Sequence, residues 1–404
     1  MTDSTSPDAP PLAGVTVVDF TRVLSGPYCT MLLADMRARV IKIEQPGRGD
    51  DTRAWGPPFV HGESAYFLSI NRNKESLTLD LKHAAARGIL DCLLERADVL
   101  VENFRPGTME RLGLSFETLA ARYPRLVYCS ISGFGQTGPR SSEPGYDAVM
   151  QGEGGLMSIT GAADGPPFRL GVAISDIVTG MFAAQGVAMA LLARVRSGRG
   201  QRVDVGMLDS TAALLTYQAG IYFATGTTPG RMGNRHPTIV PYETFAASDG
   251  QFVVAAGNDE QWRRFCGVLG ARALADDPRF AVNRARVNHY EELRPLIAGR
   301  LRSRTRSEWV EALKGAGVPC GSVRDVAEVL QDAQLDARGM VETVDHVSAG
   351  ALRVLGVPIK LSDTPGGIRT APPALGQHTE PILRADCGLS PAEIEELRVS
   401  GAIA

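Results

Sequence analysis

The first third of the chain alternates short β-branched, apolar runs with longer helical patterns. The predicted strands are residues 15–20 (VTVVDF), 38–44 (ARVIKIE), 77–81, 97–102 and 126–132. Predicted helices lie between them, for example over residues 28–36 and 83–96. Continuous apolar runs are typical of buried parallel strands. Strands and helices in alternation therefore predict an α/β fold, with a parallel sheet covered by helices on both faces.

The rest of the chain has a different pattern. Residues 133–167 are rich in Gly, Ser and Pro, which favours site-forming loops. Residues 176–196 are predicted to form a long helix with an apolar stripe. After residue 237, the segment VPYETFAASDGQFVVAAG indicates two strands joined by a Ser-Asp-Gly turn, and charged helical stretches follow. We expect a second, smaller α+β domain here, and a last helix over residues 391–400.

The composition indicates which classes of binding partner the protein is not expected to have. The formal net charge is -3, so the sequence gives no reason to expect a basic face for nucleic acid or a membrane surface. The opening MTDSTSPDAPPLAG lacks the basic and apolar regions of a signal peptide. No uninterrupted apolar stretch of about 18 residues is present, so no membrane span is expected. We expect a cytoplasmic protein.

The usual cofactor and metal motifs are absent from the sequence. The six cysteines include no CxxC pair and are expected to be reduced thiols, and there is no HExxH, so no metal site is expected. The loop after the first predicted strand, TRVLSGP, lacks the glycines of GxGxxG that let a backbone approach a pyrophosphate. GxxxxGK[ST] and GxSxG are absent too.

Asp176 lies where an apolar stretch meets a predicted helix start, in GVAISDIVTGMFAAQGVAMALLAR. Aspartate is a favoured N-cap residue, because its carboxylate accepts a backbone N–H bond. The free N–H groups and the positive end of the helix dipole would also stabilise an ionised carboxylate nucleophile. The same groups could stabilise an oxyanion formed on attack at a thioester. Local sequence leaves both interpretations open.

A series of motifs nevertheless resembles one family over nearly the whole chain. The motifs are DFTRVLSGP, VIKIEQPGRGDDTR, NRNKESLTLDLK, VENFRPGTMERLG, ISGFGQTGP, GYDAV, GLMSITG, GVAISDIVTGMFAA, RSGRGQRVDVGMLD, GVPCG and LGQHT. In this order they resemble the class III CoA-transferases, which include formyl-CoA:oxalate, carnitine and dicarboxylate CoA-transferases. GDDTRAWGPPFV, ITGAADG and IVPYETF are most similar to the succinyl-CoA:glutarate type and to bacterial relatives acting on malate, mesaconate or itaconate.

The resemblance implies a fold and an assembly. A Rossmann-like large domain would span residues 1–205, completed by about 381–404, and a small α+β domain would span residues 237–330. Residues 206–236 and 331–380 would be long linkers, and two chains would interlock as a homodimer. Such loops normally count against an assignment, but an interlocked dimer uses them as wrapping arms.

The resemblance also assigns residues. It places the family's nucleophilic aspartate at Asp176. Its CoA-contacting positions fall on Leu24, Ser25, residues 79–82 with Leu79 and Lys82, Asn103, Phe104, Arg105, Arg111, and residues 143–146 with Tyr146. Lys82, Arg105 and Arg111 could meet phosphates of CoA, although each also fits a solvated surface charge. Phe104 could flank the adenine.

The implied reaction moves CoA from an acyl-CoA, which the closer resemblance implies is succinyl-CoA, to a small carboxylic acid through an aspartyl-CoA thioester. It uses CoA and acyl-CoA as substrates and needs no permanently bound cofactor. A C4 or C5 dicarboxylate acceptor would keep one free carboxylate, which a cation should hold in a closed pocket. The candidates are Arg22, Arg53, Arg72, and, as the preferred pair, Arg235 with His236.

Two departures and two rival functions accompany the resemblance. Gln45 replaces a basic residue found in the oxalate enzymes, and MGNRHPTIVPY replaces their glycine-rich lid, so oxalate is not the expected acceptor. An α-methylacyl-CoA racemase on the same fold would need a histidine where this chain has Tyr146, a poor base near neutral pH. A non-catalytic acyl-CoA-binding protein is the other rival.

Overall fold

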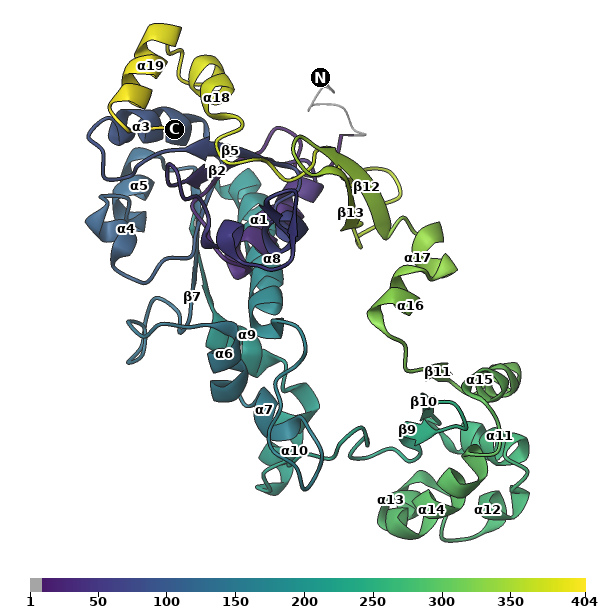
Figure 1. Ribbon diagram of the computed structural model, residues 1–404. Coiled ribbons are helices and arrows are strands. Elements are labelled where there is room, and N and C mark those ends of the chain that lie inside the picture. The colour runs from purple at the N-terminus through teal and green to yellow at the C-terminus, as the bar shows by residue number, and fades with distance from the viewer. Residues whose placement is uncertain (1–8) are drawn as a thin grey trace. The chain divides into compact units, whose positions relative to one another are not determined.

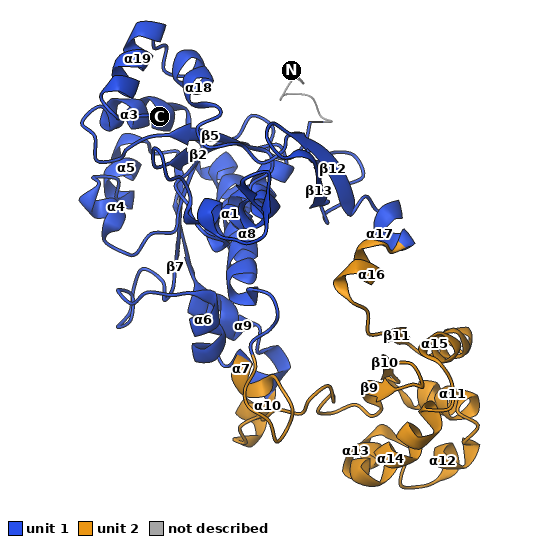
Figure 2. Ribbon diagram, in the orientation of Figure 1, with its two compact units in different colours: residues 1–156, 169–220, 333–404 blue, residues 157–168, 221–332 orange. Residues whose placement is uncertain are grey.

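A computed structural model describes residues 9–404 of the chain. It divides into two compact units (Figure 2). Unit 1 contains the chain up to residue 156, residues 169–220 and residues 333–404. Unit 2 contains residues 157–168 and 221–332. Most of the opening examined for a signal peptide, residues 1–8, lies outside the described residues.

A six-stranded parallel sheet is the centre of unit 1 (Figure 1). In spatial order its strands are β5 (Lys74–Thr78), β2 (Arg39–Glu44), β1 (Thr16–Asp19), β6 (Val99–Glu102), β7 (Val127–Ser132) and β8 (Arg202–Gly206). The predicted parallel α/β sheet is therefore confirmed. The strand predicted over 77–81 lies three residues earlier, and β8 at the sheet edge was not predicted.

Both faces of the sheet are buried, as the apolar strands require. Val17 and Val40 face one side, where they pack with Ala183 and Val187 of a long helix. The next residues along the same strands, Val18 and Ile41, face the other side and join a second core. Because strand side chains alternate between faces, each apolar strand contributes to two cores at once.

Helices cover both faces. The first core is closed by α1 (Ser25–Asp35) and α8 (Ile174–Ser197). The second is closed by α3 (Ala86–Arg96), α4 (Thr108–Arg111), α5 (Phe116–Arg122), α18 (Thr379–Ala385) and α19 (Pro391–Val399). The predicted helices over 28–36, 83–96, 176–196 and 391–400 all form, with ends displaced by up to three residues.

Shorter elements complete unit 1. They are η1 (Asp51–Ala54), β3 (Phe59–Val60), β4 (Glu63–Ser64), α2 (Ala65–Ile70), α6 (Asp147–Glu153), α9 (Met207–Ala213), α17 (Ala333–Ala337) and the hairpin of β12 (Val341–His346) and β13 (Gly350–Leu355). α7 (Leu156–Ile159) and α10 (Thr216–Thr225) each cross from one unit to the other. The segments predicted as linkers thus carry regular structure.

The C-terminal helices are tied to α3 by a covalent bond. Cys92 of α3 and Cys387, between α18 and α19, form a disulfide across 295 residues of sequence. The prediction that all six cysteines are reduced thiols is therefore wrong for this pair. The chain between α18 and α19 returns over α3, and nothing in the local sequence of either cysteine indicates that meeting.

Unit 2 has its own core around the buried Trp262, Phe252 and Phe280. Its antiparallel sheet has the order β11 (Cys320–Ser322), β10 (Gln251–Ala255), β9 (Tyr242–Ala246), which confirms the predicted strand pair. The surrounding helices are α11 (Asp259–Val268), α12 (Arg272–Asp276), α13 (Asn283–Asn288), α14 (Tyr290–Leu301), α15 (Arg306–Gly315) and α16 (Val326–Leu330).

The helix α8 is long and apolar enough to cross a membrane by length and composition. Core helices of globular proteins pass the same test, and α8 packs along α1 and against the strands of the sheet. Its first turn also carries the buried carboxyl group of Asp176. These contacts describe a helix of the unit 1 core.

Candidate active site

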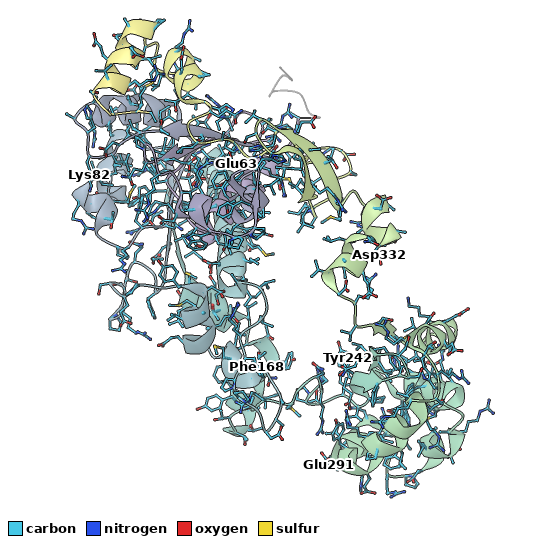
Figure 3. All side chains as sticks on the ribbon, in the orientation of Figure 1. Glu63, Lys82, Phe168, Tyr242, Glu291 and Asp332 are labelled. Atoms are coloured by element: carbon cyan, nitrogen blue, oxygen red, sulfur yellow. A yellow bond between two sulfur atoms is a disulfide. The ribbon has the colours of Figure 1, made fainter. Side chains whose placement is uncertain are left out.

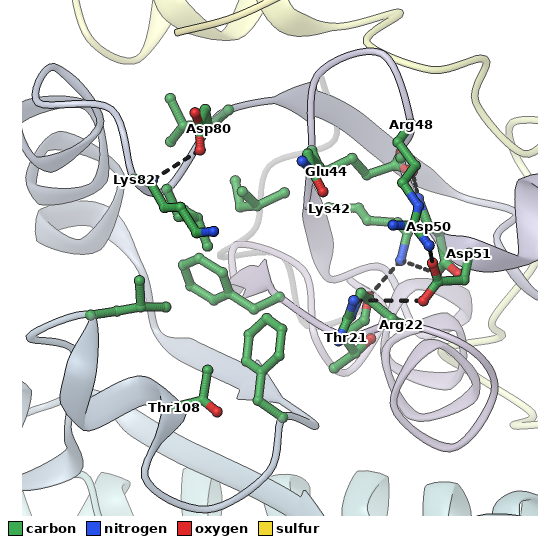
Figure 4. Close-up of a pocket in the computed structure, with 18 residues that line it drawn as sticks. Thr21, Arg22, Lys42, Glu44, Arg48, Asp50, Asp51, Asp80, Lys82 and Thr108 are labelled. Carbon is green, nitrogen blue, oxygen red and sulfur yellow. Dashed lines mark hydrogen bonds and ion pairs between the residues drawn. The ribbon is translucent and has the colours of Figure 1, made fainter.

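The carboxyl ends of the central strands open into a cleft of about 440 Å³ (Figure 4). Here β1 lies between β2 and β6, so the chain leaves β1 at the point where the strand order reverses, the usual ligand site of such sheets. Four cations line the cleft, Arg22, Lys42, Arg48 and Lys82, together with four carboxylates, Glu44, Asp50, Asp51 and Asp80. Apolar side chains of Phe20, Leu79, Phe104 and Leu112 are also part of its wall.

Two of these cations lie beside one acidic residue. Arg48 binds Asp51 at 2.6 Å and Arg22 approaches the same carboxylate at 3.5 Å. Lys82 contributes its charge from the loop after β5, where its backbone N–H donates to Asp80 (Figures 3 and 4). The cleft therefore combines apolar walls with charged groups of both signs, and its cations can meet an anionic ligand with a flat apolar part.

A second cleft surrounds Asp176 and shares Arg22, Asp51 and Phe104 with the first. Its volume is about 150 Å³. Its other ionisable members are Arg105, Glu143 and Tyr146. Because the two clefts share walls, one long ligand can extend from the basic cleft to the carboxyl group of Asp176.

Asp176 lies in the first turn of α8 and is only 8% exposed. The N-cap residue is Ala173, so the interpretation of Asp176 as an N-cap is wrong. The first turn is capped from another helix, because the N–H of Ser175 donates to Asp147 of α6 at 2.9 Å. Ser25, at the start of α1, lies beside this carboxyl group, and its hydroxyl and backbone N–H favour the ionised form.

A glycine one turn later allows this contact. A Cβ atom on Gly180 would lie 2.5 Å from the carbonyl oxygen of Ser25 and 3.2 Å from the backbone nitrogen of Cys29. Residues four apart share a helix face, so Gly180 lies below Asp176 on the side that meets α1. The close approach of α1 to α8 therefore depends on glycine at this position.

The pKa of Asp176 is raised to about 7, first by burial and then by the negative charge of Asp147. The hydroxyl and the backbone N–H of Ser25 lower this pKa and so act in the opposite direction. Tyr66 of α2 lies within electrostatic range of Asp176, and its own pKa is raised to about 12, mainly by burial, so it remains protonated. Burial and Asp147 together therefore oppose the ionised form of Asp176 that attack on a thioester requires.

Comparison with known proteins identifies the family. The model of CoA-transferase family III matches residues 12–379. This chain belongs to CoA-transferase family III. It is 41% identical to the succinyl-CoA:glutarate CoA-transferase of Mus musculus over 393 residues, covering 97% of this chain and 90% of that one.

Two further relatives widen the comparison. The acetyl-CoA:oxalate CoA-transferase of Acetobacter aceti is 44% identical over 361 residues, covering 89% of this chain and 91% of that one. A crystal structure of a CAIB/BAIF family protein from Brucella suis matches with a TM-score of 0.83 and 42% identity, covering 93% and 98% of the two chains. Overall identity thus does not separate glutarate from oxalate relatives. The chain is a family III CoA-transferase enzyme that acts on CoA thioesters.

The structure of this CoA-transferase gathers most of the predicted CoA-contacting residues in the two clefts. Leu79, Lys82 and Phe104 line the basic cleft, and Ser25, Asn103, Phe104, Arg105 and Tyr146 line the cleft of Asp176. Leu24 is buried beside that cleft. Arg111 lies outside both linings and donates to Thr108, which is part of the first. Their contacts with CoA stay a prediction.

The five residues predicted to hold the distal carboxylate are not gathered in one place. Arg22 alone lines the cleft of Asp176. Arg53 makes a bidentate ion pair with Glu44, and Arg72 makes one with Asp35. Both guanidinium groups are therefore already paired within the protein, and this pairing competes with binding of a substrate carboxylate.

The preferred pair belongs to unit 2. The guanidinium of Arg235 lies 3.5 Å from the ring centre of Tyr290, and its charge is 4.0 Å from Glu291. His236 packs against Tyr242 with ring centres 5.1 Å apart, and burial lowers its pKa. These contacts leave the proposed role of the pair untested.

Several residues of the clefts were not singled out from the sequence. Arg48 supplies a cation three residues beyond Gln45, the position where the expected basic residue is absent. Asp51 binds Arg48, and Asp147 acts on Asp176. All three lie inside quoted motifs, but their roles depend on contacts between strands and helices. Within residues 9–404, no group of three or more His, Cys, Asp and Glu side chains is arranged to hold a metal ion.

Proposed function

We propose that this enzyme moves CoA from succinyl-CoA to a C4 or C5 dicarboxylate through a thioester on Asp176. One observation carries the proposal. A buried carboxyl group, beside the hydroxyl and the backbone N–H of Ser25, lines a cleft that shares walls with a larger cleft of charged and apolar side chains. The glutarate, citramalate and mesaconate relatives, each named for succinyl-CoA as well, support the choice of donor and acceptor class.

The first half-reaction forms the covalent enzyme. An oxygen of Asp176 attacks the thioester carbonyl carbon, the C–S bond breaks, and CoA leaves as a thiolate. The product is a mixed anhydride between Asp176 and the donor acyl group. The thiolate then attacks the carbonyl carbon of Asp176, and the donor leaves as a carboxylate. This path splits one difficult exchange into easier steps.

The second half-reaction runs in the opposite direction. The acceptor carboxylate attacks the aspartyl thioester and releases the CoA thiolate, again giving an anhydride. The thiolate attacks the acceptor's carbonyl carbon, which forms the new acyl-CoA and returns Asp176 as a carboxylate. One thioester replaces another, so no net energy source is required. The two Ser25 donors and the amino end of α8 would stabilise negative charge at each step.

The acceptor class can be tested by one screen. The enzyme is mixed with succinyl-CoA and, separately, glutarate, malate, mesaconate, itaconate or oxalate, and the new thioester is identified by mass. We expect product with at least one C4 or C5 acid and the fastest turnover with that acid. Turnover confined to oxalate or to monocarboxylates would contradict the proposed acceptor class.

The pKa of Asp176 predicts the acid side of the pH profile. Only the ionised carboxylate can attack, and its pKa is about 7 because of burial and Asp147. Formation of the covalent enzyme should therefore fall about tenfold for each pH unit below about 7. Single-turnover rates measured across pH check this expectation. A rate that stays constant down to about pH 5 would contradict it.

A homodimer is part of the proposal. α8 leaves Met181, Phe182, Met189, Leu192 and Val195 exposed, and exposed apolar surface of this kind marks interaction sites. We expect a dimer by light scattering at micromolar concentration, and dissociation or precipitation after Leu192→Glu. A folded wild-type monomer at that concentration would contradict the proposed interlocked assembly.

We also propose a cytoplasmic location without membrane attachment. A disulfide is uncommon in that compartment, and the structure pairs Cys92 with Cys387. Thiol titration of protein purified without reductant would count the free cysteines in solution. To test the location itself, the cells that make the protein are fractionated, and we expect the protein in the soluble fraction.

A further inference from the structure

The loop that carries the donors for Asp176 has an unusual backbone. It joins β1 to α1 through residues 21–24, and Val23 has a φ of 69°. Left-handed backbone is a real outlier for a β-branched residue, because its side chain crowds the neighbouring carbonyl. Such a conformation persists only where the surroundings hold it, and it is commonly found at functional sites.

The surroundings hold this loop at successive backbone groups. The N–H and the carbonyl of Arg22 are both bound by the side chain of Asn103, at 2.8 and 2.7 Å. The N–H of Val23 donates to Asp50 at 3.2 Å. The carbonyl of Leu24 accepts the N–H of Tyr28 at 2.8 Å, which begins α1. The loop is thus fixed from β6, from the segment after β2, and from its own helix.

A buried ion pair provides the anchor on the β2 side (Figure 4). Lys42 is fully buried, Asp50 is 1% exposed, and their charged atoms are 2.9 Å apart. Lys42 also donates to the carbonyl of Thr21 at 2.7 Å. The same pair therefore binds the loop at Thr21 through the lysine and at Val23 through the aspartate.

Close packing on both sides of Ser25 extends this constraint to that residue. A Cβ on Gly26 would lie 2.3 Å from the Cβ of Thr21, so the loop folds tightly against the start of α1. On the other side, Gly180 brings Ser25 against α8 as described above. A shift of Thr21 or Val23 would therefore move Ser25 relative to the carboxylate of Asp176.

We propose that the buried Asp50–Lys42 pair is a positioning device for the reaction, because it holds the strained loop so that the hydroxyl and the backbone N–H of Ser25 stay beside Asp176. The inference rests on the proposed function of Asp176. Neither Asp50 nor Lys42 touches the reacting atoms in this role. They act through the backbone of Thr21 and Val23.

The test is Asp50→Asn in the full-length enzyme, measured as the single-turnover rate of covalent enzyme–CoA formation across pH. A loosened loop moves the donor groups of Ser25 away from Asp176, and these groups favour the ionised carboxylate. The acid limb of the profile should move up by about one pH unit, which lowers the rate at pH 7 about fivefold. The saturating concentration of succinyl-CoA should change little.

The direction of the shift separates positioning from simple electrostatics. Asp50→Asn removes a negative charge and leaves Lys42 with only the charges of Asp19 and Glu44 near it. Both changes acting through space would move the limb to lower pH. A limb that is unchanged or lower, in a variant with wild-type circular dichroism, would overturn the proposal. Asp51→Asn is the matched control, since Asp51 contacts Arg22 and Arg48 by side chain only, and it should not raise the limb.

Two variants keep the test decisive if Asp50→Asn does not fold. Asp50→Glu keeps the charge pair with Lys42 but displaces the carboxylate from Val23. The acid limb of the rate profile should therefore again move to higher pH. Asn103→Ala releases Arg22 from the other side of the loop without changing charge, and the same upward shift is expected. If neither variant moves the acid limb to higher pH, the inference is rejected. If the wild-type enzyme forms no covalent CoA adduct at any pH, the proposed function itself has failed.

Discussion

Asp176→Asn is expected to abolish CoA transfer, with a loss of at least about a thousandfold, while the protein stays folded. Asparagine keeps the size of the side chain and one acceptor oxygen. It cannot form the anhydride and thioester that carry CoA in the proposed reaction. Steady-state turnover with succinyl-CoA and a dicarboxylate measures the loss, and Asp176→Ala should behave alike.

The same variant should be more stable than the wild type above neutral pH. The pKa of Asp176 is about 7 in the folded protein against 3.8 for the ordinary group. Between these values the folded state binds more protons than the unfolded state, so wild-type stability falls as pH rises from about 4 to about 7. Above pH 7 the buried carboxylate costs about 4 kcal/mol, from about 3 pKa units.

Denaturant unfolding at two pH values checks the sign. At pH 8 we expect Asp176→Asn to unfold at higher denaturant than the wild type, and the difference should shrink as pH approaches about 4. Asp164→Asn, an exposed aspartate in unit 2, is the control and should change neither activity nor stability. An Asp176→Asn enzyme with near-normal turnover would contradict the assigned nucleophile.

Arg22→Ala should reduce turnover with dicarboxylate acceptors about a hundredfold and affect a monocarboxylate of matched length much less. Arg22 is the only one of the five candidate cations that lines the cleft of Asp176 within the described residues. Its side chain is half exposed, and its ion pair with Asp51 is long at 3.5 Å. It therefore retains donors for a carboxylate, which a guanidinium binds in bidentate fashion.

The alternative sites make the comparison informative. The double variant Arg235→Ala, His236→Ala tests the unit 2 pair with succinate, glutarate and the same monocarboxylate. If the double variant loses turnover selectively with the dicarboxylates, while Arg22→Ala loses turnover equally with all acids, the unit 2 pair holds the distal carboxylate. Equal losses for every acid in Arg22→Ala alone would instead indicate a contact with CoA, which both halves of the reaction use.

Local sequence was sufficient for the central strands because their β-branched runs are buried on both faces. The predicted strand over 77–81 was misplaced because the apolar run continues past the strand, where Leu79 enters the core from a loop. β8 was missed because it is an edge strand in which charged residues alternate with valines, and only Gly206 is buried. Its partner strand β7 lies about 70 residues earlier in the chain.

Site residues could be predicted where a sequence motif resembled the family. Properties that depend on tertiary contacts could not be predicted from the sequence. Asp176 stood in a recognisable segment, but its raised pKa comes from burial and from Asp147, which only the fold brings near. Asp50 follows β2 and meets Val23 because β1 and β2 are neighbours. The disulfide joins residues 295 positions apart, and no local pattern encodes it.

The central claim is that CoA is carried covalently on Asp176. The most direct measurement is the intact mass of the enzyme after brief mixing with succinyl-CoA and no acceptor, followed by peptide mapping. We predict one CoA bound as a thioester to the peptide that contains Asp176, removed by hydroxylamine and absent from Asp176→Asn. A wild-type enzyme that turns over without any covalent CoA, or that carries it on another residue, would contradict this account.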